Sequence, residues 1–257
     1  MKTGFLSLAL LAIFASSPAL AHDFWAGAQT LTEGQPLTAV LGFGHNFPEG
    51  EAIVADQIGV RYNPLKVLGP DGELSLKKGS ETKLYVSEQP LAKGTYLVLS
   101  TTIPMFRSNT PEGWISKPKN EALAATTCRF ASSFGKAVVN TGGAKDTALA
   151  SKPVGHDLEI VPQINPAQIK AGQKFPVKVL FKGRPMPGAS VEAFFAGFSD
   201  DGSYAFAGQT NQEGLINIIP LKGGEWLAKV SESRPYSDQA KCDTENYNAS
   251  LTFTIAD

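Results

Sequence analysis

The feature that most constrains the fold of this 257-residue chain is a succession of short apolar runs, each broken by glycine, proline, asparagine or aspartate. In the clearest run, Phe175, Val177, Val179 and Phe181 alternate with other residues, which is the period of a strand with one buried face. Similar runs occur at residues 37–43, 83–86, 95–100, 158–162, 189–195, 215–219, 224–230 and 251–255. Helical periodicity is scarce, so the pattern predicts an all-β protein built from antiparallel sheets.

Two local features refine this prediction. The runs at 83–86 and 95–100 are predicted to be a pair of strands joined by the loop from Pro90 to Gly94. Residues 120–134 contain several alanines and could form a short helix, although Thr126 and Thr127 lower its helix propensity.

A polar, glycine-containing stretch from Asn140 to Gly155 predicts a loop and a domain boundary. We therefore expect two tandem antiparallel β-sandwich domains, at residues 22–155 and 156–257. The second half resembles the small transthyretin-like and carboxypeptidase-regulatory-like sandwiches, in its Gly183–Gly188 turn before a strand and its Thr-Asn-x-x-Gly turn at 210–214. That resemblance implies an immunoglobulin/transthyretin-like fold and little about function, because such sandwiches are common scaffolds.

The first 21 residues have the three parts of a secretory signal peptide. Lys2 supplies the positive charge, an apolar run follows from Phe5 to Ala15, and Ala19-Leu20-Ala21 is a cleavage site of small residues. The alternative is an uncleaved anchor, but the run is shorter than the roughly 20 apolar residues that span a bilayer. We expect cleavage after Ala21 and a periplasmic protein without a membrane span.

Charge and cysteine content narrow the class further. The formal net charge is −1, which disfavours nucleic acid as a partner because binding it needs a basic surface. The two cysteines, Cys128 and Cys242, predict a disulfide in an oxidising compartment; two reduced thiols are the alternative.

Histidine is scarce, and its three positions are informative. His22 becomes the first residue after cleavage, so its free α-amine and ring Nδ1 can chelate one metal ion. His45 lies between Gly44 and Asn46 in a predicted loop, and His156 lies where the first half meets the second. Three imidazoles and an amine suit a divalent transition-metal ion: Cu(II) or Ni(II) in a tetragonal site, or Ni(II) or Co(II) with added oxygen ligands, with Zn(II) also compatible. Asp23, Glu49 and Asp157 are candidates for further ligands or hydrogen-bond acceptors; for every one of these residues an incidental surface or structural role is the alternative.

The chain resembles the DUF4198 family in three segments that each contain a histidine. They are His-Asp-Phe-Trp at 22–25, Gly-His-Asn-Phe-Pro at 44–48, and Gly-His-Asp-Leu-Glu-Ile-Val-Pro at 155–162. Members are similar to periplasmic components of nickel and cobalt uptake systems. The resemblance implies a metal-binding accessory protein, with His22, His45 and His156 as ligands and a membrane metal transporter as partner.

Three functions therefore compete. The first is a nickel- or cobalt-binding protein that is not an enzyme. The second is a copper-binding protein or a copper oxygenase that uses the N-terminal histidine. The third is a structural or adhesive module with incidental histidines. The sequence has no Gly-x-Ser-x-Gly elbow, Walker loop or His-Glu-x-x-His motif, which disfavours the hydrolases, nucleotide-binding proteins and zinc peptidases that these motifs mark.

Overall fold

A computed structural model describes residues 22–198 and 203–256 of the chain, and the predicted signal peptide, residues 1–21, lies outside the described residues. Strands account for 53% of the structure and helices for 6%, which confirms the all-β prediction. Among the described residues, no helix is both long and apolar enough to cross a membrane.

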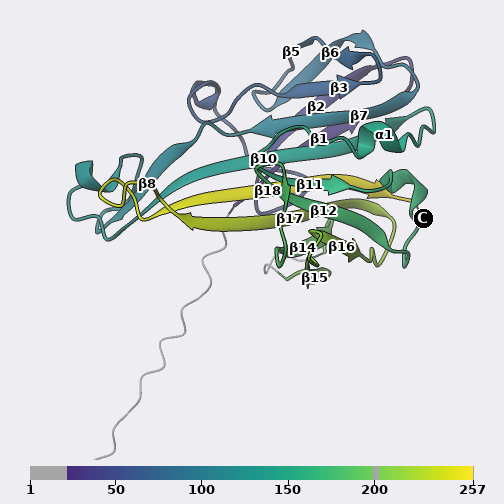
Figure 1. The fold of residues 1–257 in the computed structure, drawn as a ribbon. Coiled ribbons are helices and arrows are strands. Elements are labelled where there is room, and N and C mark those ends of the chain that lie inside the picture. The colour runs from purple at the N-terminus through teal and green to yellow at the C-terminus, as the bar shows by residue number, and fades with distance from the viewer. Residues whose placement is uncertain (1–21, 199–202, 257) are drawn as a thin grey trace, which may run out of the picture.

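The described strands form three sheets (Figure 1). The first sheet has the order β1 (Asp23–Thr30), β2 (Pro36–Gly44), β6 (Leu84–Pro90) and β5 (Leu76–Lys78). The long central sheet has the order β15 (Phe206–Gln209), β14 (Ser190–Phe195), β17 (Gly224–Pro235), β18 (Thr244–Ile255), β10 (Thr127–Thr141), β7 (Gly94–Thr101), β3 (Lys66–Gly69) and β4 (Gly72–Glu73). Two further strands extend this sheet: β8 (Met105–Thr110) pairs with β10, and β9 (Gly113–Ile115) pairs with β8. The third sheet contains β11 (Leu158–Pro162), β12 (Phe175–Phe181), β13 (Arg184–Pro185) and β16 (Leu215–Ile218).

Within residues 22–198 and 203–256, helical structure is confined to single turns. They are α1 (Thr147–Ala150) and the 3-10 turns η1 (Ala55–Gln57), η2 (Lys119–Glu121) and η3 (Pro166–Gln168). The predicted short helix at 120–134 is wrong, because most of that stretch belongs to β10. Pairing of β10 with β7 and β8 on one side and β18 on the other outweighs the local helix propensity of residues 127–134.

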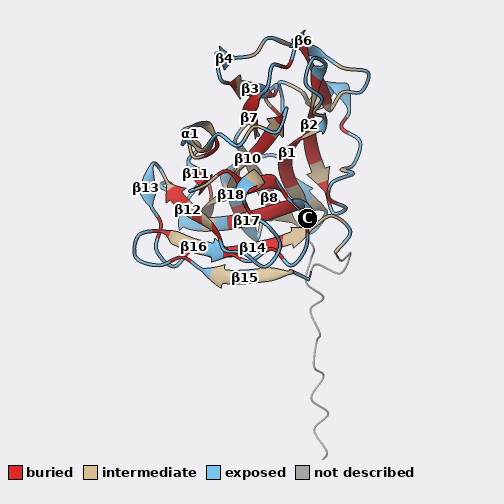
Figure 2. Cartoon of the chain, turned by 90° about the vertical axis from the view of Figure 1, so that its right-hand side faces the viewer, coloured by how far each residue is buried: buried red, intermediate tan, exposed pale blue. Residues whose placement is uncertain are grey.

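The central sheet packs against a different sheet on each face. Ala137 and Val139 of β10 belong to the core that the first sheet covers, whereas Val138 belongs to the core that the third sheet covers. This alternation follows from the two-residue period of a strand. Figure 2 shows the buried residues concentrated on the strands in the middle of the molecule.

The predicted pairing of the strands at 83–86 and 95–100 is wrong. Residues 84–90 form β6 of the first sheet, and residues 94–101 form β7 of the central sheet. The intervening loop therefore carries the chain across the first core, from one layer to the other. Both strands exist as predicted, but their partners lie elsewhere in the sequence.

The two halves of the chain share the central sheet. Strand β10 pairs in parallel with β18, from Arg129 opposite Thr244 to Ala137 opposite Thr252. The predicted disulfide is confirmed: Cys128 and Cys242 are bonded just before this ladder begins, with their Cα atoms 4.9 Å apart. The predicted boundary between residues 155 and 156 stays a prediction; hydrogen bonds of one sheet run through both halves.

Strand β1 crosses directly over β10, and Gly135 makes this close approach possible. A Cβ atom at Gly135 would lie 2.6 Å from the Ala26 nitrogen and 2.8 Å from the Trp25 carbonyl carbon, distances that real Cβ atoms do not show. This contact fixes β1, and with it the position of His22 immediately before that strand.

Candidate metal centre

The register of the first two strands brings His22 and His45 together. Strand β1 pairs antiparallel with β2, and Asp23 lies opposite Gly44. His22 precedes Asp23 and His45 follows Gly44, so the two histidines face each other one residue beyond the last pair of the β1–β2 ladder. Their ring centroids are 4.0 Å apart.

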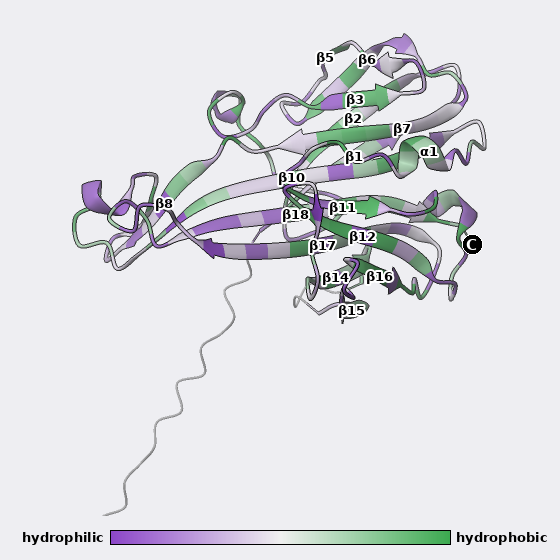
Figure 3. Ribbon diagram, viewed as in Figure 1, coloured by the Kyte–Doolittle hydropathy of each residue, from purple (hydrophilic) through white to green (hydrophobic). Residues whose placement is uncertain are grey.

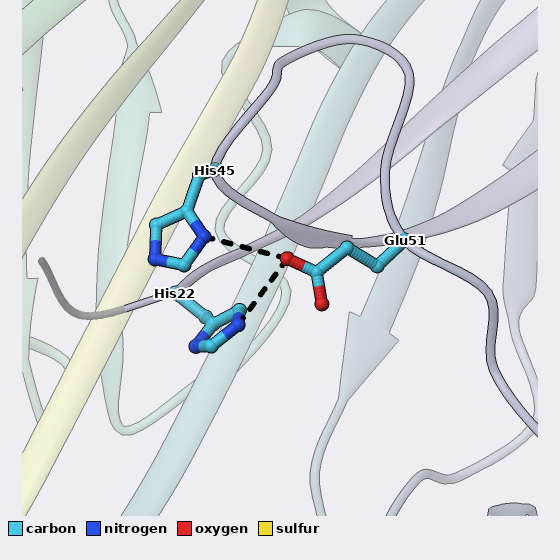
Figure 4. A group of neighbouring side chains, drawn as sticks. All are labelled: His22, His45 and Glu51. Atoms are coloured by element: carbon cyan, nitrogen blue, oxygen red, sulfur yellow. Dashed lines mark ion pairs between the residues drawn. The ribbon is translucent and has the colours of Figure 1, made fainter. Parts of the chain in front are cut away.

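A carboxylate that the sequence analysis did not select completes the cluster. One oxygen of Glu51, Oε1, lies 3.2 Å from His22 Nε2 and 3.3 Å from His45 Nδ1 (Figure 4). One donor atom from each of the three side chains lies within 4.8 Å of the others, which is compatible with binding of a single metal ion. The side chains are 41%, 36% and 50% exposed for His22, His45 and Glu51, so an ion can reach them from solvent.

The short connection after β2 holds Glu51 in this place. The Glu51 N–H donates to the Phe43 carbonyl at 2.6 Å, which folds the loop back on the strand end. Gly44 has φ of +137°, a conformation that favours glycine, and a Cβ atom there would lie 2.9 Å from Glu51 Cγ. Glycine at position 44 therefore leaves room for the Glu51 side chain beside the histidines.

An aromatic ring orients His22. The imidazole lies parallel to the ring of Phe43, with 4.6 Å between centroids and 5° between planes. Phe43 in turn contacts Tyr62, at 6.1 Å between centroids, and the guanidinium of Arg61, at 4.8 Å. This packing limits rotation of the His22 ring and keeps Nε2 directed at Glu51.

The structure does not bring His156 to the other two histidines. Its ring packs against Phe134, with 5.2 Å between centroids, and it is not a member of the cluster. Burial lowers the pKa of His156 to about 4, even though the nearby Glu159 carboxylate raises it. Glu159 is itself buried and paired with Lys136, and it accepts the N–H groups of Val154 and Gly155.

The other predicted carboxylates do not join the cluster either. Asp23 pairs with Lys229 at 2.8 Å, and neither Glu49 nor Asp157 belongs to the cluster. Glu51 was missed because nothing in the local pattern distinguishes it from Glu49. The distinguishing signal is the antiparallel return after β2, which depends on the Gly44 conformation.

Comparison with known proteins places the chain in a family. The profile described as a domain of unknown function, DUF4198, matches residues 19–234, most of the chain. The chain belongs to the DUF4198 family. No curated protein matches it. Among solved structures it is similar to the fibronectin(III)-like modules of CbhA from Clostridium thermocellum, at 10% identity, with 90% of this chain and 93% of that chain covered and a TM-score of 0.19.

Proposed function

We propose that this DUF4198 protein is a periplasmic transition-metal-binding protein, with Ni(II) or Co(II) as its cargo, that is accessory to a membrane metal transporter. The observation that carries the metal site is the convergence of His22, His45 and Glu51. Location and transport role rest on the predicted signal peptide and on the family resemblance.

The ring nitrogens that do not face Glu51 supply the metal ligands in this proposal. His22 Nε2 and His45 Nδ1 lie at hydrogen-bond distance from the carboxylate. Figure 4 shows the other nitrogen of each ring on the side away from Glu51. Cleavage after Ala21 would add the α-amine of His22, which chelates together with Nδ1 of the same residue. The resulting set is the α-amine, His22 Nδ1 and His45 Nε2.

Glu51 then acts as a positioning residue. A carboxylate that accepts an N–H from a metal-binding imidazole fixes its tautomer and orientation and makes it a stronger ligand. Here one carboxylate oxygen would do this for both rings. The ion would lie on the opposite, exposed side of the imidazoles, where coordination positions stay open to a further ligand.

This open set of nitrogens also favours the copper alternative. Tetragonal nitrogen sites suit Cu(II) as well as Ni(II), and His156 does not supply a third imidazole that would occupy an open position. A copper-binding protein or copper oxygenase is therefore the second candidate. A strong copper preference, together with oxygen-dependent cleavage of a polysaccharide in the presence of ascorbate, would favour it over the first.

The test is a calorimetric titration of the correctly processed protein with Ni(II), Co(II), Cu(II) and Zn(II) in turn. We expect one ion per chain and a strong loss of affinity in His22→Ala and in His45→Ala. His156→Ala is the matched control and should bind as the wild type does. Equal affinity of all four proteins would overturn the site. Loss of metal affinity in His156→Ala alone would show that His156 is a ligand.

A further inference from the structure

Three arginines that have no acidic partner among the described residues lie near one another, and one of them, Arg61, contacts an aromatic ring of the metal centre. Arg107 of β8 and Arg129 of β10 are directly opposite each other in the antiparallel ladder. Like charges in this position destabilise a sheet. Burial lowers the pKa of Arg107, and the positive charges of Arg61 and Arg129 lower it further. We call Arg61, Arg107 and Arg129 the arginine shelf.

The shelf begins at the metal centre. The Arg61 carbonyl accepts the N–H of Ile103 at 2.9 Å, which fixes Arg61 beside the segment that leads into β8. Its guanidinium lies 4.8 Å from the centroid of Phe43, the ring on which His22 stacks. Phe43 therefore contacts both the first arginine of the shelf and the first predicted metal ligand.

Contacts of these arginines leave hydrogen-bonding capacity free. Across residues 22–198 and 203–256, none of the three forms an ion pair with a carboxylate. Arg129 lies over the ring of Trp114 at 4.6 Å, and Arg107 donates to the Ser116 hydroxyl at 3.4 Å. A guanidinium stacked on a ring keeps its planar fork of N–H donors available for a carboxylate or phosphate.

The outer end of the shelf is hollowed. A depression of about 420 Å³ is lined by Arg129 and Trp114 together with Thr127, Thr244 and Asn246. Asp243 also lines it, but this carboxylate is paired with Lys119 at 2.7 Å. Figure 1 shows β8 and the adjoining ends of β10, β17 and β18 extending beyond the first sheet, and Figure 3 shows β17 and β18 to be hydrophilic there.

We propose that the arginine shelf binds a small polycarboxylate that carries the metal ion to His22 and His45 as a chelate. The inference rests on the proposed metal site. A carboxylate can bind a divalent ion with one group and a guanidinium, through two parallel hydrogen bonds, with another. The open coordination positions and the unpaired arginines therefore both suit a polycarboxylate, and its negative charge offsets the repulsion between Arg107 and Arg129.

The test uses citrate as the probe and the processed, full-length protein. Free Ni(II), metal-free citrate and the preformed Ni(II)–citrate complex are titrated into the wild type and into Arg107→Gln/Arg129→Gln. The control, Lys77→Gln/Lys174→Gln, removes two exposed positive charges elsewhere. We expect the arginine variant to bind Ni(II)–citrate at least about tenfold more weakly than the wild type and the control, with its affinity for free Ni(II) unchanged.

The outcomes separate the two proposals. Equal affinity of wild type and arginine variant for Ni(II)–citrate, with free Ni(II) still bound, would overturn the shelf and leave the metal site standing. Failure of free Ni(II) and of Ni(II)–citrate to bind the wild type would overturn both the metal site and the shelf as binding sites for nickel. Binding of polygalacturonate that depends on Arg107 and Arg129, without binding of Ni(II)–citrate, would replace the small polycarboxylate by an acidic polysaccharide.

Thermal unfolding of the arginine variant checks that it folds. We expect no loss of thermal stability, because two facing charges are removed.

Discussion

At the scale of single residues, one carboxylate oxygen serves two imidazoles. Glu51 Oε1 is within hydrogen-bond distance of both His22 and His45, and no lysine or arginine is paired with Glu51 among the described residues. The side chain is half exposed, so its contribution to stability is small. Its main effect should be on the orientation of the rings and hence on metal affinity.

The first prediction concerns that role. Glu51→Gln retains the shape of the side chain but removes the charge, and we expect metal affinity to fall by about 10- to 100-fold. Glu49→Gln, an exposed glutamate of the same loop, is the matched control and should leave affinity unchanged. Calorimetric titration of the two variants measures the difference. Equal affinities would show that Glu51 neither positions the imidazoles nor binds the metal ion.

The second prediction concerns His156. Burial lowers the pKa of its imidazole from an ordinary value of 6.5 to about 4. The unfolded chain therefore binds this proton at a higher pH than the folded chain does, and the free energy of unfolding decreases as the pH falls from 6.5 to 4. We expect a decrease of up to about 3 kcal/mol from this group.

Denaturant unfolding of the wild type and of His156→Gln, at pH 7 and at pH 4.5, measures this contribution. Carboxylates destabilise both proteins in acid, so the difference between the two pH dependences isolates the histidine. Parallel pH dependences would mean that His156 is accessible to protons in the folded state, and that its ring does not lose hydration against Phe134.

At the scale of elements, the sequence predicted most strands and few of their partners. Alternation over Phe175–Phe181 identifies β12 because a single buried face leaves a local signature. Whether β6 pairs with β7 depends on contacts between distant segments, and the two lie in opposite layers. The same reason explains the site: His22 and His45 were selected by their residue type, whereas Glu51 required the register of β1 against β2.

The third prediction concerns the disulfide at the start of the β10–β18 ladder. Cys128 and Cys242 are 114 residues apart, and closing a loop of that length stabilises a fold by about 5 kcal/mol on the chain-entropy model. We expect reduction to lower the free energy of unfolding by that order. Cys128→Ala/Cys242→Ala is the control, and its free energy of unfolding should not change when reductant is added. Identical denaturant midpoints of the wild type with and without reductant would contradict the prediction.

At the scale of the whole molecule, the two halves share both a sheet and a core. Leu97, Leu99 and Val138 of the first half pack into the core of the second, and β10 pairs with β18 over nine positions, from Arg129↔Thr244 to Ala137↔Thr252. Composition alone predicts a linker at residues 140–155. Composition cannot reveal that the strands on either side of such a loop lie in layers packed on each other.

The fourth prediction follows from this continuity. We expect one cooperative unfolding transition for the whole chain, with coincident far-ultraviolet circular dichroism, tryptophan fluorescence and calorimetric signals. Residues 22–155 expressed alone should not fold stably, because β10 would lose its partner β18 and the first half would expose core residues such as Leu97, Leu99 and Val138. Two separate transitions, or a folded 22–155 fragment, would instead establish independent domains.

The most direct test of the metal centre is the role of the His22 α-amine. Two proteins are compared by calorimetric titration with Ni(II) and Cu(II): one that begins at His22, and one with a single glycine inserted before it. We predict one-to-one binding by the first and an affinity at least about 100-fold lower, or about 3 kcal/mol, for the second, because the amine and ring can no longer chelate from one residue. Equal affinity would contradict the chelate and with it the proposed geometry of the site.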